Sequence, residues 1–273
     1  MNAPQNASSP TRSAAPSAPV ALVTGASRGL GRALAQALAE AGWQLVITAR
    51  NERELSVAEA ELAAVTKVVA LAGSVVDDAH RAHLAEAAAG LGGASLLVNN
   101  AGTLNGSDGQ GAPLPRLADV PLPDLLETFE VNALAPIALT QLVLPQLRAH
   151  AGAVLNISSD AAVEAYVGWG GYGASKAALD QASAVLAREE PELKVWAVDP
   201  GTMRTRMYQD AYPSEDISGE LPPEAVAPAL LGLLRGGVAS GRYRASDLPA
   251  EAGSAAHAGQ AAHAGQAGAR EDR

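Results

Sequence analysis

The sequence TGASRGLG, residues 24–31, follows a short apolar run at 20–23 and precedes an alanine- and leucine-rich helical pattern at 30–41. Glycines at such a turn let the backbone change direction sharply and approach a pyrophosphate closely. The first amides of the following helix would then face the phosphates with the positive end of the helix dipole. A glycine-rich connector without a ligand is the alternative. The motif therefore indicates a dinucleotide site only if a strand precedes it and a helix follows it.

Short apolar runs and longer helical patterns alternate outward from this turn. Strands are expected at 20–23, 45–48, 68–71, 95–98, 153–157 and 193–198, with a weaker one at 241–244. Helices are expected at 30–41, 52–65, 77–89, 124–149, 172–188 and 223–234. Within 124–149, Pro136 and Pro145 would bend or shorten the helix. This alternation predicts an α/β fold of the Rossmann type, a doubly wound parallel sheet of about seven strands with helices on both faces. Ligands are expected at the carboxyl ends of the strands.

The composition excludes several classes of protein. The chain has 273 residues, of which 48% are hydrophobic, so it can bury a large core. The absence of cysteine excludes disulfides, thiolate nucleophiles and cysteine-based metal sites, and it is consistent with a cytoplasmic protein. No apolar run is long enough for a membrane span. The net charge of −10 at pH 7 argues against nucleic acid and membrane partners. No metal site is indicated.

Composition also divides the chain into three segments. We predict one dinucleotide-binding and catalytic domain over residues 19–249. Residues 1–18 are rich in alanine, serine and proline, and residues 250–273 are rich in alanine and glycine, so both are expected to be disordered. The C-terminal segment contains AAHAGQ twice, at 255–260 and 261–266. His257 and His263 in these repeats are interpreted as solvated side chains rather than metal ligands.

The residues after the second expected strand, Ala49-Arg50-Asn51, bear on the choice of cofactor. A ribose with a free 2′-hydroxyl is usually met at this position by a carboxylate, which the three residues lack. Arg50, together with Arg28 in the glycine-rich turn, instead suits a 2′-phosphate through charge-assisted hydrogen bonds. The sequence therefore favours NADP(H), and NAD(H) stays the alternative. Either arginine taken alone could also be a solvated surface charge.

Tyr172 and Lys176 are four residues apart at the start of an expected helix, so they share one face. A nearby ammonium would lower the pKa of the Tyr172 phenol towards neutral pH, and such a tyrosine can give or take a proton. Ser159, at the end of the preceding strand, could hydrogen-bond the same substrate oxygen. Asn132, an amide within an apolar stretch, could hold a water that relays protons to Lys176. A core tyrosine and a surface lysine are the alternative for the pair in isolation.

In this order and at these spacings, TGASRGLG, NNAG, Asn132, Ser159, YGASK and PGTMRT resemble the short-chain dehydrogenase/reductases, in their short single-domain branch. The resemblance covers about residues 19–247. It implies an oxidoreductase, a carbonyl reductase or alcohol dehydrogenase, that transfers a hydride between NADP(H) and a small ketone, aldehyde or diketone. It further implies a small-molecule carbonyl or alcohol substrate and a homodimer or homotetramer.

The resemblance assigns roles to individual residues. Tyr172 would be the general acid/base, Lys176 would lower its pKa and bind the nicotinamide ribose, and Ser159 would polarise the substrate carbonyl. Asn132 would support the relay water. The cofactor-binding residues implied are Gly25, Ser27, Arg28, Gly29, Leu30, Gly31, Arg50, Ser74, Asn99, Ala101, Gly102, Tyr172, Lys176, Pro200, Gly201, Thr202 and Thr205. Ser74 departs from the family pattern, because many members have an aspartate that contacts the adenine at this position.

Two features bear on the substrate side. Gly168-Trp169 is similar to the pair before the catalytic tyrosine in sepiapterin reductase and benzil reductase-like members, so Trp169 either lines the substrate pocket or packs under its loop. Residues 206–222 are expected to form a mobile lid or a plain surface loop. A non-catalytic NADP(H)-sensing protein on the same fold is the alternative function. An epimerase or dehydratase of the longer family branch is disfavoured by the glycine spacing.

Overall fold

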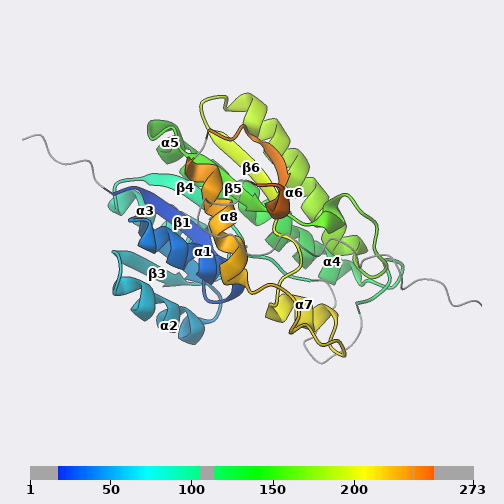
Figure 1. The fold of residues 1–273 in the computed structure, drawn as a ribbon. Coiled ribbons are helices and arrows are strands. Elements are labelled where there is room, and N and C mark those ends of the chain that lie inside the picture. Colours follow the sequence, from blue (N-terminus) through cyan, green and yellow to red (C-terminus); the bar gives the residue numbers. More distant parts are fainter. Residues whose placement is uncertain (1–17, 105–113, 236, 249–273) are drawn as a thin grey trace, which may run out of the picture.

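The computed structural model of the chain describes residues 18–104, 114–235 and 237–248 (Figure 1). Its centre is one parallel sheet in the strand order β3-β2-β1-β4-β5-β6-β7. The strands are β1 (Val20–Thr24), β2 (Gln44–Ala49), β3 (Val68–Ala72), β4 (Ala94–Asn99), β5 (Ala153–Ile157), β6 (Lys194–Asp199) and β7 (Gly241–Arg244). The predicted Rossmann-type fold is confirmed, including the weak last strand.

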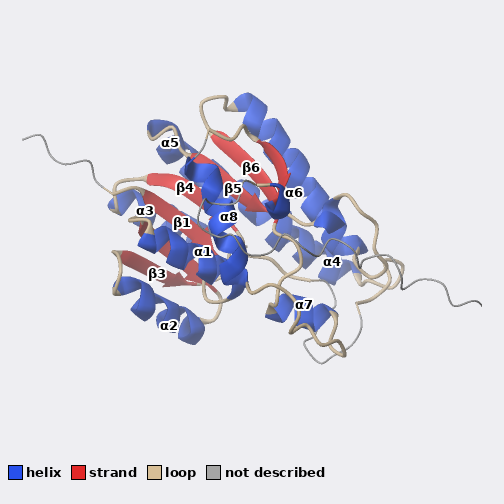
Figure 2. Ribbon diagram, viewed as in Figure 1, coloured by secondary structure: helices blue, strands red, loops and turns tan. Residues whose placement is uncertain are grey.

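Helices cover both faces of this sheet (Figure 2). One apolar cluster joins the sheet to α1 (Gly29–Glu40), α2 (Glu52–Ala63) and α8 (Pro223–Arg235). A second joins the opposite face to α3 (Asp78–Gly90), α5 (Ala135–Ala149) and α6 (Gly170–Glu189). Successive residues of β1 alternate between the clusters, because neighbouring side chains of a strand point to opposite faces. Both faces are buried, which explains why the strands read as continuous apolar runs.

The strand order places the functional end of the molecule. The chain moves outward from β1 through β2 to β3 and then returns to the other side of β1 as β4. The loops after β1 and β4 therefore diverge, and a crevice opens at the carboxyl ends of these strands. The glycine-rich turn follows β1 directly, so the fold brings it to this crevice.

The long helix expected at 124–149 is broken. It consists of α4 (Leu122–Phe129), a π-helical segment at Glu130–Leu134, and α5. Pro136 provides the physical reason, because it has no N–H to donate and its ring would clash with the carbonyl of residue 132 in a continuous α-helix. A π segment before the proline widens the backbone and relieves that clash. Pro145 lies inside α5 without ending it.

The segment expected as a lid contains a short helix, α7 (Arg206–Ala211), which the sequence pattern did not predict. Several other expectations concern residues outside the described part of the chain. These are the two terminal segments, including the AAHAGQ repeats, and part of the loop after β4. Among the described residues, no helix has the length and apolar character that a membrane crossing requires.

The turn from α5 into β5 is closely packed and yields a stability test. A Cβ added to Gly152 would lie 2.5 Å from the carbonyl oxygen of Ser95 in β4, and this backbone oxygen cannot move aside. We expect Gly152→Ala to lower the free energy of unfolding by roughly 1–3 kcal/mol through overpacking. Chemical denaturation followed by circular dichroism measures this change.

Gly90→Ala is the matched control, because among the described residues nothing lies within 4 Å of a Cβ built there. Since Gly90 ends α3, alanine should leave stability unchanged or raise it by up to about 1 kcal/mol. Equal stability of the Gly152→Ala variant and the control would show that this turn is not closely packed.

Candidate active site

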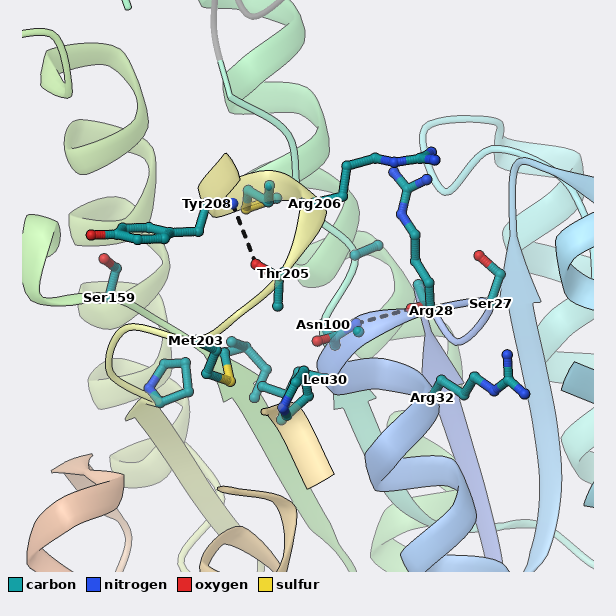
Figure 3. A pocket seen from close by; sticks show the side chains of 18 of the residues that line it. Ser27, Arg28, Leu30, Arg32, Asn100, Ser159, Met203, Thr205, Arg206 and Tyr208 are labelled. Carbon is teal, nitrogen blue, oxygen red and sulfur yellow. Dashed lines mark hydrogen bonds between the residues drawn. The ribbon is translucent and has the colours of Figure 1, made fainter. Parts of the chain in front are cut away.

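A cleft of about 1140 Å³ lies at the carboxyl ends of the strands (Figure 3). Arg28 and Arg206 lie at one end of it, and Ser159 and Tyr208 lie at the other. Most of the predicted site residues line this cleft, namely Gly25, Ser27, Arg28, Gly29, Leu30, Arg50, Ser74, Ala101, Gly102, Ser159, Tyr172, Lys176, Pro200, Gly201, Thr202 and Thr205. Residues from separate expected motifs thus meet in one place.

The glycine-rich turn forms a cradle beside the N-terminus of α1. Gly25 and Gly29 have φ values of 67° and 56°, a backbone conformation that favours glycine. A Cβ on Gly25 would lie 2.8 Å from Nδ2, the side-chain amide nitrogen of Asn100. No side chain among the described residues caps α1, so its first amides stay available as donors. This donor set fits a phosphate group.

Thr24 and Asn100 hold this turn against β4. The side-chain amide of Asn100 donates to the carbonyl oxygens of Thr24 at 2.9 Å and Gly25 at 3.2 Å. The Thr24 hydroxyl accepts from the backbone amides of Asn100 and Ala101, both at 3.0 Å. The NNAG segment therefore shapes the turn that it faces.

Gly31 and Asn99 differ from their expected roles, because neither lines the cleft. A Cβ on Gly31 would clash with Asn100 and Gly25, so this glycine permits α1 to pack on the turn. Asn99 is buried, and its side-chain amide donates to Oδ1 of Asn156 on β5 at 2.8 Å. Asn99 therefore bonds the adjacent strand, and Asn100 lies on the cleft wall.

Tyr172 and Lys176 meet on one face of α6, as expected. Their side chains are buried, and Nζ of Lys176 lies 5.6 Å from the centroid of the Tyr172 ring. The ammonium donates to the carbonyl oxygen of Ile157 at 2.8 Å. Burial lowers the pKa of Lys176 to about 8, and the negative charge of Asp180 acts in the opposite direction. Lys176 therefore titrates far closer to neutral pH than an exposed lysine does.

The pKa of Tyr172 differs from the expected one. Burial raises the pKa of its phenol, and the hydrogen bond with Ser159 acts in the opposite direction. The carboxylates of Asp160 and Asp199 raise this pKa further. The sequence-based expectation of a lowered pKa is therefore wrong for this structure, because desolvation is the largest influence on the phenol. Tyr172 therefore holds its proton at neutral pH.

Asn132 lies in the π-helical segment and does not line the cleft. Its amide nitrogen donates to the carbonyl oxygen of Thr103 at 2.9 Å and to Oγ of Ser175 at 3.0 Å. Its Oδ1 accepts from the Thr103 amide at 2.8 Å. The side chain thus fixes the loop after β4, and its expected support of a relay water stays a prediction.

An aromatic wall, defined here as Trp169, Tyr172, Tyr208 and Tyr212, borders the substrate end of the cleft. The Trp169 ring packs edge-on against Tyr172 with centroids 5.4 Å apart, and it lies 6.0 Å from Tyr212. Trp169 Nε1 donates to the Tyr212 hydroxyl at 3.2 Å. Of the two expected positions for Trp169, the structure has it on the cleft wall. The four-residue spacing of Tyr208 and Tyr212 is the signal that could have revealed their shared face.

Asp160 is a cleft residue that the sequence reasoning missed. Its Oδ1 accepts from the Ser159 hydroxyl at 3.0 Å and from the Ala161 amide at 2.8 Å. Its Oδ2 accepts from the Tyr166 hydroxyl at 3.1 Å. A carboxylate therefore orients the serine and gives the substrate end a negative charge. Its position directly after Ser159 was the only available signal.

Glu54 on α2 joins two arginines at the other end of the cleft. Its carboxylate lies 3.5 Å from Nη1 of Arg28 and 3.7 Å from Nη1 of Arg206 on α7. Both arginine side chains are more than half exposed, so these long ion pairs contribute little to stability. An anionic ligand could replace the carboxylate at little cost. The described residues contain no group of three or more His, Asp or Glu side chains that could hold a metal ion.

Comparisons with known proteins find similar reductases. Sepiapterin reductase from Bos taurus is 34% identical over 203 residues, covering 69% of this chain and 74% of that protein. Benzil reductase ((S)-benzoin forming) from Bacillus subtilis is 27% identical over 254 residues, covering 81% of this chain and 95% of that protein. Both were among the resemblances expected from Gly168-Trp169.

Among solved structures, an alcohol dehydrogenase from the archaeon Thermococcus sibiricus, complexed with 5-hydroxy-NADP, superposes with a TM-score of 0.74. It shares 25% sequence identity, over 83% of this chain and 95% of that one. Residues 19–216 match the family described as short chain dehydrogenase. The chain therefore belongs to the short chain dehydrogenase family of oxidoreductases.

Proposed function

We propose that the protein is an NADP(H)-dependent carbonyl reductase that acts on small ketones, aldehydes or diketones, with Tyr172 as its general acid. One observation carries the proposal: Ser159, Tyr172 and Lys176 line the same cleft as the uncapped N-terminus of α1. A protein that only sensed the cofactor would need the phosphate cradle alone. The buried lysine and the phenol beside it favour catalysis over sensing.

The residues present fit a phosphorylated dinucleotide. The amides at the start of α1 would hold the pyrophosphate, and Ser74 would face the adenine. Arg28 and Arg50 would bind the 2′-phosphate, which supports NADP(H) over NAD(H). Arg28 would exchange its weak contact with Glu54 for this phosphate. The NADP-type ligand of the Thermococcus sibiricus relative is consistent with this assignment.

Bound NADPH supplies the hydride that the carbonyl carbon accepts. As the C=O bond becomes an alkoxide, Tyr172 transfers its phenolic proton to the carbonyl oxygen. The Ser159 hydroxyl hydrogen-bonds the same oxygen and orients the carbonyl. The Lys176 ammonium stabilises the phenolate that remains on Tyr172. The raised pKa of the Tyr172 phenol keeps the proton in place until this transfer.

The lining of the substrate end favours uncharged aromatic carbonyl compounds. The aromatic wall offers ring faces and edges on which a planar substrate can pack. Asp160 adds negative charge beside the reacting position, and this charge raises the pKa of Tyr172 and of Tyr208. A carboxylate on the substrate would be repelled here. We therefore propose aromatic ketones and diketones as better substrates than 2-oxo acids.

We also propose that the protein forms a homodimer or homotetramer through α4, α5 and α6. Apolar side chains on this part of the molecule are exposed, among them Leu126, Leu142 and Val185. Association between copies would remove them from water.

The catalytic role of Tyr172 is tested by substitution. Tyr172→Phe removes the only proton that this side chain can donate, so kcat should fall by a factor of about 10² or more. NADPH oxidation is followed against aldehydes, aromatic ketones, diketones and 2-oxo acids, and NADPH binding is measured by fluorescence. Binding should persist in the variant.

Tyr243→Phe is the matched control, because the Tyr243 hydroxyl donates to the carbonyl oxygen of Ala239 and does not line the cleft. It should reduce carbonyls at the wild-type rate. Near-wild-type turnover by Tyr172→Phe would refute the proton-transfer role. NADPH binding without turnover of any substrate by the wild type would favour the sensing alternative.

The cofactor preference is tested at the two arginines. Arg28→Gln and Arg50→Gln should each raise KM for NADPH roughly tenfold or more, because a charge-assisted hydrogen bond to the 2′-phosphate is lost. KM for NADH should change far less, since NADH has no such phosphate. Steady-state kinetics with both cofactors measures the ratio. Equal effects on the two cofactors would contradict the assignment of the 2′-phosphate site.

The pH dependence of reduction follows from Lys176. Its pKa is lowered to about 8, so the ammonium is present below this pH and is lost as the pH rises through it. Since Tyr172 keeps its proton over the same range, kcat/KM for carbonyl reduction should fall above about pH 8. A pH profile at fixed NADPH measures this decline. A decline near the ordinary lysine value of about 10.4 would contradict the role of burial.

A further inference from the structure

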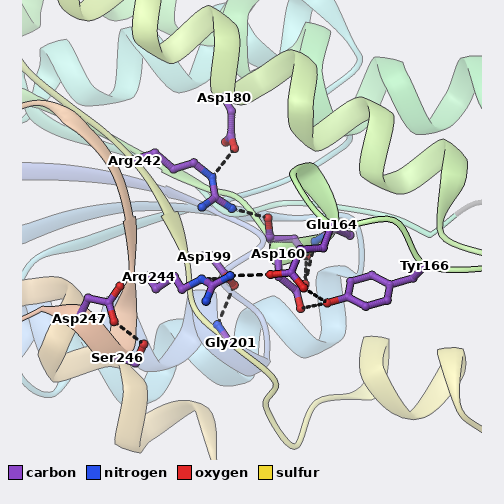
Figure 4. Close-up of polar contacts among 12 residues, drawn as sticks. Asp160, Glu164, Tyr166, Asp180, Asp199, Gly201, Arg242, Arg244, Ser246 and Asp247 are labelled. Atoms are coloured by element: carbon purple, nitrogen blue, oxygen red, sulfur yellow. Dashed lines mark hydrogen bonds and ion pairs between the residues drawn. The ribbon is translucent and has the colours of Figure 1, made fainter. Parts of the chain in front are cut away.

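Arg242 on β7, the last strand of the sheet, pairs with Asp180 on α6 (Figure 4). It lies on β7 opposite Ala197 of β6, and its side chain is largely buried. Its Nη2 donates to the main-chain carbonyl oxygen of Ser159 at 2.8 Å. Its Nε donates to Oδ2 of Asp180 on α6, also at 2.8 Å. One guanidinium thus contacts the residue that carries the serine hydroxyl and the helix that carries Lys176.

The contact with Ser159 fixes backbone rather than side chain. Ser159 follows β5 in an extended conformation and precedes the 3₁₀ turn at Asp160–Ala162. At this point the chain leaves the sheet, so the carbonyl of Ser159 has no place in the strand ladder. The Arg242 guanidinium holds it at 2.8 Å, together with the Ala162 amide of the 3₁₀ turn, which donates to the same oxygen at 3.2 Å. The hydroxyl oxygen Oγ and this carbonyl belong to the same residue, so a shift of the Ser159 backbone moves both. The position of Oγ therefore depends on Arg242.

The contact with Asp180 concerns charge. Asp180 lies one helical turn after Lys176 on the same helix, and its carboxylate favours the charged form of that lysine. Its Oδ1 is buried and has no hydrogen-bond partner among the described residues. Arg242 is the cation that balances this carboxylate. The share of the Asp180 charge that Lys176 experiences therefore depends on Arg242.

We propose that Arg242 is a positioning residue of the active site: paired with Asp180, it holds the Ser159 backbone and balances the charge that Asp180 exerts on Lys176. The inference rests on the proposed function, because it assigns Arg242 to the same reaction. It extends the site to a strand at the edge of the sheet, which contributes no cleft-lining residue among those described.

Charged and titratable groups around Lys176 come from several elements. On α6 these are Tyr172 and Asp180, and on β7 Arg242 balances the latter. Asp160 of the 3₁₀ turn and Asp199 of β6 line the same cleft and act on Tyr172. Arg242 and Arg244 both favour the charged form of Asp199. Arg242→Gln therefore acts on two carboxylates, Asp180 and Asp199, whereas Asp180→Asn changes the Arg242–Asp180 pair alone.

The test compares three variants by kcat, KM and the pH profile of carbonyl reduction. Arg242→Gln should lower kcat several-fold and move the decline of kcat/KM to higher pH by roughly 0.5–1 unit, because Asp180 is left unbalanced. Asp180→Asn should move the decline to lower pH by a similar amount. Arg242→Lys keeps the charge but cannot make both contacts, so its decline should stay in place while kcat falls.

The opposite directions of the two pH shifts separate this role from a structural one, since general destabilisation moves both variants alike. Arg148→Gln is the matched control: it removes another arginine–carboxylate pair, with Glu190 at the exposed end of α6, and should leave kcat and the pH profile unchanged. Circular dichroism and thermal unfolding check each variant. If Arg242→Gln does not fold, Arg242→Lys and Asp180→Asn carry the test.

Two results would overturn the inference. Wild-type kcat and an unshifted pH profile in Arg242→Gln would refute it while leaving the proposed function intact. Shifts in the same direction for Arg242→Gln and Asp180→Asn would refute the charge balance. If none of the carbonyl compounds supports NADPH oxidation by the wild-type protein, the proposed function fails, and this inference fails with it.

Discussion

The burial of the Lys176 ammonium is the constraint on which the active site depends. A charged amine removed from water is unstable unless its protons find acceptors and its charge finds a counterpart. The carbonyl of Ile157 supplies an acceptor, and Asp180 supplies negative charge. Both lie close to groups for which we propose catalytic roles, because Ile157 ends β5 two residues before Ser159 and Asp180 shares α6 with Tyr172. Satisfying the lysine therefore also fixes the serine and the phenol.

Much of the fold could be predicted from the sequence, because each strand of a sheet covered on both faces is a continuous apolar run. The lining of the cleft followed from where those runs end. The position of Asn99 could not be predicted from one sequence, because nothing there indicates which of two adjacent asparagines faces the cleft. That choice depends on the pleat of β4 and on its register with β5. The carboxylate of Asp160 and the pKa of Tyr172 depend on side-chain packing and burial, which no motif encodes.

The two ends of the cleft are built differently. The end that carries Arg28 and Arg206 has exposed side chains and long ion pairs, which can rearrange around a ligand. The end that carries Ser159 and Tyr172 is held by hydrogen bonds from side chains to the main chain, such as those of the buried Lys176 and the partly buried Arg242. The arginine end of the cleft can therefore adapt its shape to a ligand, whereas the groups proposed to react are preorganised.

The π-helical segment before Pro136 has a consequence for the length of the chain at this point. A π turn is equivalent to one residue inserted into an α-helix, and each residue of an α-helix advances the rotation by about 100°. Deleting one residue between Glu130 and Leu134 would restore the α-helical hydrogen bonds and leave α4 and α5 in nearly the same phase, because the wider π turn takes up the rotation of the extra residue. Asn132 would then lose its contact with Thr103. The extra residue therefore serves the placement of Asn132 rather than the direction of the two helices.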